Sequence, residues 1–584
     1  MIRSMTRRLS DVSGVHDEIE LGIHVGWVCH EGAFDDCAPI WNERRDVCLI
    51  FTGEDFQDDS NLDLLRREGR IVDETKASYL VHLYETFGPS FVERLNGWFS
   101  GVVIDRRRAR AFLFNDRYGL RRIYFHQARD AFYFASEAKA LLEVVPNLKR
   151  LDPSAIAEML SFGCVLENRT LFKGVHLLPG GSLWSFSGKT IVERSTYFDR
   201  SMWENRPLLK GAQFYERLKE TFTSILPKYF RGGPLAISLT GGLDCRMIMA
   251  WGGQAAGSLP CVTFGGVYRE CADVRIARRV AQHCRQPHQT ITVGAAFLGD
   301  FPALAEKTVL VSDGSMDVTG AVEFYVNEIV RRLCRVRLTG NYGSEVIRGH
   351  VAFRPRLDRW EVLEPELARL VAIAPVRYRE QRACRDQTFI AFKQVPWHHY
   401  ARLSVEASHL TPRSPFLDNE LVGLMYQAPA DLLASREPSF RLIAEGDPRL
   451  ARIPTDRGLS FPSIPVLSGL RSMWEETGAK AEYAYDYGMP QWLASLDHAA
   501  RPLKLEHLFL GRQKFYHFRV WYRDQLSSYV RDVLLDRRTL ERGYLRGAAF
   551  RKCVESHLEG RQNHTTMITK MLTLEVVHRT LLRA

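Results

Sequence analysis

The stretch Pro234-Leu-Ala-Ile-Ser-Leu-Thr-Gly-Gly-Leu-Asp-Cys-Arg-Met-Ile-Met-Ala250 decides the fold of this chain. Its apolar run from Leu235 to Leu239 predicts a short buried strand, and we expect a helix to begin near Asp244. The small residues between them form a loop whose backbone N–H groups can converge on an anion, and the positive end of the helix points to the same place. A carboxylate there suggests a Mg²⁺ ion bridging Asp244 and a phosphate group.

This loop lacks the lysine of a Walker A motif, and its glycine spacing differs from that of a dinucleotide-binding fold. It resembles the S-G-G-x-D-S loop of ATP pyrophosphatases. The resemblance implies that the loop binds the β- and γ-phosphates of ATP while a carboxylate is adenylated. It assigns to the nucleotide Leu239, Thr240, Gly241, Gly242, Leu243, Asp244 and Cys245. The alternative is an ordinary strand–Gly-Gly–helix turn of an α/β domain.

Size and composition indicate the class of protein that contains this loop. With 584 residues the chain exceeds a single hydrophobic core, so two or more domains are expected. No apolar run approaches the about 20 residues of a membrane helix, and no secretory signal is recognisable. The 11 cysteines form no C-x-x-C pair, which favours a cytoplasmic protein with reduced thiols. The net charge of +10 is spread along the chain, so we expect no nucleic-acid binding, and the lack of a long apolar run predicts no membrane partner.

The N-terminal third has the alternation typical of an antiparallel β domain. Apolar residues recur at helical spacing from Thr75 to Phe87, which predicts one helix there. This helix interrupts the strands. The predicted strands are Leu21–Cys29, Val47–Thr52, Trp98–Ile104, Ala111–Asn115, Arg122–His126 and Ala131–Ala135.

Several motifs in this region resemble the class II glutamine amidotransferase domain of asparagine synthetases. They are Leu95-Asn-Gly-Trp-Phe-Ser100, Asn115-Asp-Arg-Tyr-Gly-Leu120, Phe134-Ala-Ser-Glu-Ala-Lys-Ala-Leu-Leu142 and the linker-like Thr170-Leu-Phe-Lys-Gly-Val175. The resemblance implies an α/β protein of two domains. Residues 1–200 would form an antiparallel, β-rich α+β glutaminase-like domain of the Ntn type. Residues 210–584 would form a doubly wound α/β ATP-pyrophosphatase (synthetase) domain with a helical C-terminal part.

The glutaminase-like domain departs from its family at the catalytic positions. The family uses a cysteine directly after the initiator methionine, with its own amine as base, whereas here Ile2 follows and the first cysteine is Cys29. The family's Asn-Gly-Glu contact appears as Thr52-Gly53-Glu54, and its next aspartate falls near Lys76 and Ala77. We therefore expect a folded but catalytically silent domain. A mis-assigned start codon is the alternative.

The second half predicts a parallel sheet with ligands at the carboxyl ends of its strands. Its strand candidates are Leu235–Leu239, Pro260–Phe264, His288–Val293 and Val336–Thr339. The run Cys261-Val-Thr-Phe-Gly-Gly266 resembles the second strand of the synthetase fold, where the following loop approaches the adenine. The resemblance makes Phe264 a stacking or wall residue, and a plain core role is the alternative.

The run Leu338-Thr-Gly-Asn-Tyr-Gly-Ser-Glu-Val346 lies where the family carries S-G-(Asp/Glu)-G-x-D-E. Gly340 fits the nucleotide-binding turn in either register. Without a gap, Ser344 takes the metal-binding position; with one inserted residue, Glu345 takes it, and Tyr342 occupies the place of the tyrosine base of β-lactam synthetases. Mg²⁺ on ATP is commonly held by one or two carboxylates. We therefore predict Asp244 and Glu345 as metal ligands, and Tyr342 as a base or orienting group or, alternatively, as part of a structural turn.

Further motifs complete the resemblance. Asp313-Gly-Ser-Met-Asp317 is similar to a family helix start near the substrate, although an N-cap role explains Asp317 almost as well. Arg413-Ser-Pro-Phe-Leu-Asp418 resembles a family motif whose role is expected to be architectural. Arg457 stands nearest to the lysine that stabilises the adenylation transition state in the family, with a surface arginine as the alternative. His398 and His399 have no third ligand at useful spacing, so we interpret them as packing residues.

These observations predict an ATP-dependent carbon–nitrogen ligase similar to asparagine synthetase, with ATP and Mg²⁺ as cofactors. It would adenylate a small-molecule or peptide carboxylate with Tyr342, Glu345 and Arg457 as catalytic residues, and then form an amide with an amine or ammonia. An intramolecular cyclase of the lasso-peptide or β-lactam type is an alternative, and a non-catalytic regulatory protein is another. The acyl substrate and the amine stay open, as does assembly as a homodimer or with a protein encoded nearby.

Overall fold

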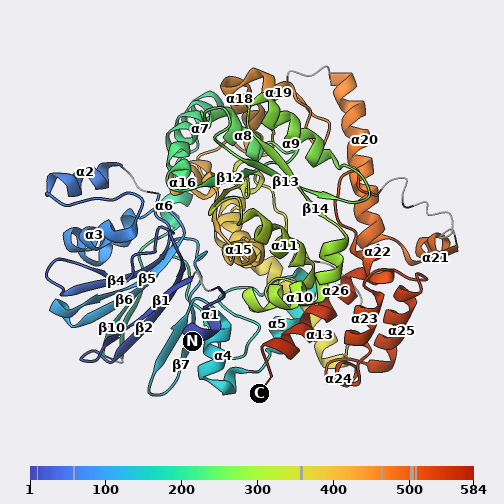
Figure 1. The fold of residues 1–584 in the computed structure, drawn as a ribbon, viewed down its shortest axis with the longest axis horizontal. Helices are drawn as coiled ribbons and strands as arrows, with labels where there is room; N and C mark the ends of the chain where they lie inside the picture. Colours follow the sequence, from blue (N-terminus) through green and yellow to red (C-terminus); the bar gives the residue numbers. More distant parts are fainter. Residues whose placement is uncertain are drawn as a thin grey trace.

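The N-terminal part of the chain is built on antiparallel sheets, as expected. The computed structural model describes residues 1–8, 11–56, 59–188, 190–355, 360–461, 465–499, 506 and 510–583. The main sheet has the strand order β11-β10-β6-β5-β4-β3 (Figure 1). Its strands are β3 (Ile40–Trp41), β4 (Val47–Gly53), β5 (Phe99–Asp105), β6 (Arg110–Asn115), β10 (Ser182–Ser187) and β11 (Thr190–Thr196).

Two smaller sheets accompany it, and every strand predicted in this region is present within a few residues. They contain β1 (Asp11–Glu18) and β2 (Ile23–His30), and β7 (Tyr124–Gln127), β8 (Phe132–Ala135) and β9 (His176–Leu177). The predicted helix 75–87 begins later, as a 3₁₀ turn Ala77–Tyr79 followed by α3 (Leu80–Phe87). Strands β1 and β11 have no counterpart among the predicted strands, because much of each is exposed and gives no buried alternation.

The second sheet is parallel throughout and has the order β14-β13-β12-β15-β16. Its strands are β12 (Leu235–Ser238), β13 (Cys261–Gly266), β14 (His288–Val293), β15 (Val336–Leu338) and β16 (Thr411–Arg413). The chain winds outward in one direction from β12 to β14 and then returns to the other side of β12 for β15. This doubly wound arrangement confirms the predicted fold class and creates a switch point between β12 and β15, where ligands of such folds bind.

Helices cover both faces of this sheet (Figure 1). On one face, Ile237 packs in the same core as residues of α8 (Asp244–Trp251) and α9 (Ala272–His283). On the other face, Ala236 packs with residues of α10 (Ala295–Val311) and α11 (Ala321–Val330). Successive residues of a strand point to opposite faces, so one short apolar strand contributes to two cores.

The remainder of the chain is helical. After α12 (Gly343–Arg348) and α13 (Pro365–Arg382), a π-helical segment, Ile390–His399, leads into α15 (Tyr400–Ala407). The C-terminal helices are α20 (Pro465–Tyr483), α21 (Gln491–Ala499), α22 (Phe518–Arg523), α23 (Ser527–Leu534), α24 (Arg537–Leu540), α25 (Gly547–Leu558) and α26 (Thr565–Thr580). None of the described helices combines the length and apolarity that crossing a membrane would require.

The motif from Arg413 to Asp418 joins the two parts of the chain. Arg413, at the end of β16, donates two hydrogen bonds to the Glu54 carboxylate, at 2.9 and 2.6 Å. Asp418 accepts a hydrogen bond of 2.8 Å from the Asn96 side chain. All four residues are buried. These contacts agree with the architectural role expected for the motif, because they tie the parallel sheet to the N-terminal domain.

Candidate functional site

A cavity of about 970 Å³ opens at the switch point of the parallel sheet. Its lining comes from the ends of β12, β13 and β15, from α15 and from the C-terminal helices. Of the residues predicted for nucleotide, metal or catalysis, those that line it are Leu239, Thr240, Gly242, Asp244, Cys245, Phe264, Gly340, Tyr342 and Glu345. Gly241, Leu243 and Arg457 are not part of the lining. The volume falls in the range of pockets that hold whole nucleotides or drug-sized ligands.

The predicted phosphate loop folds tightly before α8. The N–H of Gly241 donates to the Asp273 carboxylate at 2.6 Å, and the N–H of Gly242 donates to the Thr240 hydroxyl at 3.3 Å. A Cβ atom on Gly241 would lie 2.9 Å from the Cβ of Asp456, so only glycine fits at this point. Burial and the nearby Asp456 raise the pKa of Asp273 to about 6. Both of these amide groups are therefore engaged within the protein, and the prediction that the loop amides bind an anion stays a prediction.

Asp244 lies at the start of α8 and is paired with Arg348 at the end of α12. The two nitrogen–oxygen distances are 3.0 and 3.3 Å. Burial raises the pKa of Asp244 to about 6, while Arg348 acts in the opposite direction. Gly340 and Gly343 allow this approach, because a Cβ on Gly343 would lie 2.6 Å from the Asp244 Cγ and one on Gly340 would lie 2.6 Å from the backbone nitrogen of Cys245.

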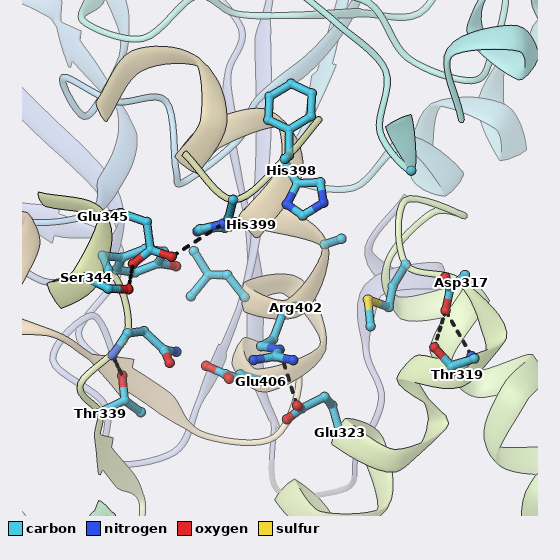
Figure 2. A pocket seen from close by; sticks show the side chains of 18 of the residues that line it. Asp317, Thr319, Glu323, Thr339, Ser344, Glu345, His398, His399, Arg402 and Glu406 are labelled. Carbon is cyan, nitrogen blue, oxygen red and sulfur yellow. Dashed lines mark hydrogen bonds and ion pairs between the residues drawn. The ribbon is translucent and has the colours of Figure 1, made fainter. Parts of the chain in front are cut away.

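Glu345 lies in the first turn of α12 and faces the same cavity. Its Oε2 accepts a hydrogen bond of 2.8 Å from the Ser344 hydroxyl, and its Oε1 lies 3.9 Å from Nε2 of His399 (Figure 2). Among the described residues, one group of three side chains lies close enough together to share a metal ion. It is Glu43, His82 and Glu85, in the N-terminal domain. Asp244 and Glu345 line one cavity but are not part of such a group in the described residues, so their predicted role as metal ligands stays a prediction.

Tyr342 immediately precedes α12 and is buried in a strained backbone conformation. Its φ angle is +71°, which is unusual for a residue other than glycine and is often found at functional sites. Its ring stacks on His399 with centroids 5.8 Å apart and meets the edge of Trp98 at 5.9 Å. Burial, and then the nearby Glu406 and Glu345, raise the pKa of Tyr342 well above its usual range. The phenol is therefore neutral, which suits a hydrogen-bonding role better than that of a base.

His399 lines the cavity, although the sequence indicated only a packing role for it. Burial lowers its pKa to about 4, so the imidazole is neutral at physiological pH. His398 lies beside it and stacks on Phe353 with centroids 5.2 Å apart (Figure 2). A histidine pair has no distinctive spacing relative to Tyr342, so only the fold brings His399 to this place.

The remaining predicted residues are placed as follows. Phe264 forms part of the cavity wall, with the Arg337 guanidinium 5.1 Å from its ring centroid. Arg457 lies beside the loop, where its Nε is 3.4 Å from the Asp456 carboxylate. Asp317 lines the cavity and caps the 3₁₀ turn Val318–Gly320. Asp313 contacts the other domain, since it accepts hydrogen bonds from the backbone of α4 (Ala138–Val144).

A second cavity, of about 270 Å³, lies between the N-terminal domain and α15. Ile2, Cys29 and Thr52 contribute to its lining, and Leu403 of α15 lines both cavities. Burial raises the pKa of Cys29 to about 12, so its sulfur is a thiol. A Cβ on Gly26 would lie 2.4 Å from the Cδ1 of Ile2, which shows how closely Ile2 packs there.

The fold thus defines a doubly wound α/β domain preceded by a β-rich domain, with a cavity at the switch point. The family model described as "Asparagine synthase" matches residues 230–439 and 498–579, and the model "Glutamine amidotransferase domain" matches residues 1–198. The chain belongs to the asparagine synthase family.

Curated relatives agree with this assignment. The chain is 24% identical over 335 residues to asparagine synthetase [glutamine-hydrolyzing] 3 of Bacillus subtilis, which covers 52% of this chain and 52% of that protein. It is 26% identical over 454 residues to an asparagine synthetase [glutamine-hydrolyzing] of Triphysaria versicolor, with 72% and 65% covered. It is also 26% identical over 246 residues to amidase chyE of Penicillium rubens, with 41% and 35% covered. The chain spans about half the length of the curated relatives it matches.

Proposed function

We propose that this protein is an ATP-dependent ligase that adenylates a carboxylate and then forms an amide, releasing AMP and pyrophosphate. The observation that carries the proposal is the placement of the 239–245 loop, Asp244 and Glu345 around one cavity at the switch point. The cavity is large enough for a nucleotide and a second substrate side by side. Membership of the asparagine synthase family supports the same chemistry.

In this proposal the two half-reactions share the cavity. An oxygen of the substrate carboxylate attacks the α-phosphorus of ATP; that bond forms as the bond to the bridging oxygen of pyrophosphate breaks. The nitrogen of an amine then attacks the acyl carbon, the bond to AMP breaks, and the nitrogen loses a proton. Holding the two reactants together in the correct orientation supplies much of the acceleration in reactions of this type.

The donor set fits a magnesium ion bound to ATP. Asp244 and Glu345 would hold the ion, which supplies charge neutralisation on the phosphates when it is bound. Asp244 becomes available to it when the ion pair with Arg348 loosens. Arg457 reaches the phosphates only if its side chain leaves Asp456. The neutral Tyr342 hydroxyl would orient the reacting carboxylate as a hydrogen-bond donor.

We further propose that the N-terminal domain does not hydrolyse glutamine. The Cys29 thiol has a raised pKa, which disfavours the thiolate that such a reaction needs. Glu54, at the position of the family's glutamine contact, is instead engaged by Arg413. The amine would then come from free ammonia, a second substrate or the acyl substrate itself.

Pyrophosphate release tests the proposal directly. Purified protein is incubated with MgATP and a panel of carboxylic acids, with and without ammonium or glutamine. Wild-type protein should release pyrophosphate, and Asp244→Asn should not. If none of the acids elicits pyrophosphate release and MgATP does not bind, a non-catalytic protein on this fold is favoured. Product formation that depends on glutamine would contradict the silent domain.

A further inference from the structure

A third cavity, of about 260 Å³, lies between the N-terminal domain and the synthetase domain. Residues 30–34, 54–56 and 74–76 line this interdomain pocket from the first domain, and residues 231–234 are among those that line it from the second. It shares no lining residue with the switch-point cavity. The interdomain pocket is therefore a separate site.

The pocket lies at the opposite edge of the parallel sheet from the proposed nucleotide site. Pro234 directly precedes β12 and Val336 begins β15, and both residues line the pocket. The loop 239–245 and the turn 339–345 follow the carboxyl ends of the same two strands. A ligand of the interdomain pocket would therefore contact the amino ends of the strands whose other ends lead to the nucleotide loop.

Positive charge exceeds negative charge in the interdomain pocket. Arg413 is paired with Glu54, and Arg231 lies 3.3 Å from the carboxylate of Glu74. Burial raises the pKa of Asp55 to about 7, so this acid is only partly ionised at neutral pH. The cationic residues that line the pocket are Lys76, Lys228, Arg231, Arg331, Arg335 and Arg413, and the acidic ones are Glu31, Glu54, Asp55 and Glu74.

Two guanidinium groups of the pocket are unpaired. Arg331, directly after α11, and Arg335, directly before β15, form neither an ion pair nor a side-chain hydrogen bond within the part of the chain that the structure describes. The guanidinium of Arg335 occupies the space in which a Cβ of residue 32 would lie, so Gly32 is what admits it. Unpaired guanidinium groups bind phosphate oxygens through two parallel hydrogen bonds.

Lysines from both domains add to this charge. Lys76 stands near the position at which the family resemblance implies an aspartate, so the charge there is reversed. Its Nζ donates to the carbonyl oxygen of Ala33 at 3.2 Å and lies 3.9 Å from the Asp36 carboxylate. The Nζ of Lys228 lies 3.5 Å from the exposed Glu420. Both distances to a carboxylate are too long for a charged hydrogen bond, so neither ammonium is neutralised at close range.

We propose that the interdomain pocket binds a small molecule carrying a phosphate dianion, either inorganic phosphate or a short phosphate monoester. Arg331 and Arg335 bind the phosphate oxygens, and Lys76 and Lys228 supply further positive charge from the two domains. Pockets for drug-sized ligands begin at about 300 Å³, so this one accommodates a phosphate with a short chain rather than a nucleotide. The proposal does not depend on the ligase function.

Isothermal titration calorimetry on the full chain at low ionic strength tests the proposal. The probes are inorganic phosphate and glycerol 3-phosphate, with acetate and succinate as anions that lack a phosphate. At least one phosphate probe should bind wild-type protein more tightly than both controls. Arg331→Met and Arg335→Met should each weaken that binding by about tenfold or more, because each removes a charged hydrogen bond. Arg332→Met, an exposed arginine outside the pocket, should leave it unchanged.

The proposal is wrong if neither phosphate probe binds more tightly than both controls, or if Arg331→Met and Arg335→Met bind phosphate as wild type does. An equal loss in Arg332→Met would show general charge attraction and would also overturn it. A saturating non-hydrolysable MgATP analogue should leave the phosphate affinity unchanged, whereas competition would place the phosphate in the nucleotide cavity instead. Phosphate should also raise the Tm of wild type and not that of Arg335→Met, and matching Tm values without phosphate show that both are folded.

Discussion

Asp244 and Arg348 face each other across the start of α8 and the end of α12, with nitrogen–oxygen distances of 3.0 and 3.3 Å. This pair joins the two segments that the sequence marked as nucleotide-binding, the loop 239–245 and the turn 339–345. It also places a cation beside the carboxylate that is proposed to hold the metal. The charge state of Asp244 should therefore control the binding of MgATP.

Binding of MgATP should weaken at low pH. The pKa of Asp244 is raised to about 6, so the carboxylate is ionised above that pH and protonated below it. Affinity should then fall by up to about tenfold per pH unit below about 6. Arg348 lowers the pKa of Asp244, so this pKa should rise further in Arg348→Met. The loss of MgATP affinity should then begin at a higher pH. Isothermal titration calorimetry measures MgATP affinity against pH for both proteins. In Asp244→Asn, any remaining pH dependence comes from the titration of ATP itself. Identical profiles for wild type and Asp244→Asn would contradict the assignment.

Gly343→Ala should disrupt the site more than it disrupts the fold. The added Cβ would meet the Asp244 Cγ at 2.6 Å, so the two segments must separate. We expect a loss of about 1–3 kcal/mol in unfolding free energy and a clear loss of MgATP affinity. Gly299→Ala is the matched control, because it lies in α10 with open space around it. Unchanged MgATP affinity in Gly343→Ala would argue against a shared site.

Tyr342→Phe should slow catalysis without weakening nucleotide binding. The substitution keeps the ring contacts with Trp98 and His399 and removes only the hydroxyl. We expect pyrophosphate release to slow by about tenfold or more, because one donor to the reacting carboxylate is lost. Since the raised pKa keeps the phenol neutral, the wild-type rate should show no rise with alkaline pH that depends on Tyr342. Such a rise, absent in Tyr342→Phe, would instead identify a phenolate base.

Breaking the Glu54–Arg413 pair should destabilise the whole protein. Both residues are buried, and either single alanine variant leaves the partner charge unmatched, at a cost of about 3–5 kcal/mol. The double variant should lose less unfolding free energy than the sum of the losses in the two single variants. Urea unfolding measures these losses. Asp63→Ala, which breaks the exposed pair with Arg66, should leave the free energy of unfolding nearly unchanged. Additive losses in the double variant would show that the pair does not join the domains.

Much of the fold could be predicted from local pattern. Strand His288–Val293 was predicted with the bounds that the structure has, because turn signals flank an alternating run. Strand β16 was missed, since it has only three residues, Thr411–Arg413, and contains a proline. The motif around Arg413 indicated an architectural role, but its partner Glu54 lies too far away in the sequence to be recognised.

The site was predictable where its chemistry is encoded in adjacent residues. The loop 239–245 and Glu345 are such cases. His399, Arg402 and Glu406 carry no local signal, because their positions depend on how α15 and the turn before it pack beside β16 and α11. A raised pKa of Tyr342 likewise follows from burial and from neighbours distant in sequence. Its place in a motif predicts a phosphate role for Arg457, whereas in the structure its side chain pairs with Asp456 beside the loop.

The edge contact between Trp98 and Tyr342 has a consequence for how this chain can be divided. Trp98 belongs to the N-terminal domain and Tyr342 to the synthetase domain, so a ring that lines the ligase cavity packs against a domain whose own chemistry is proposed to be lost. The synthetase domain on its own would lose this support for Tyr342.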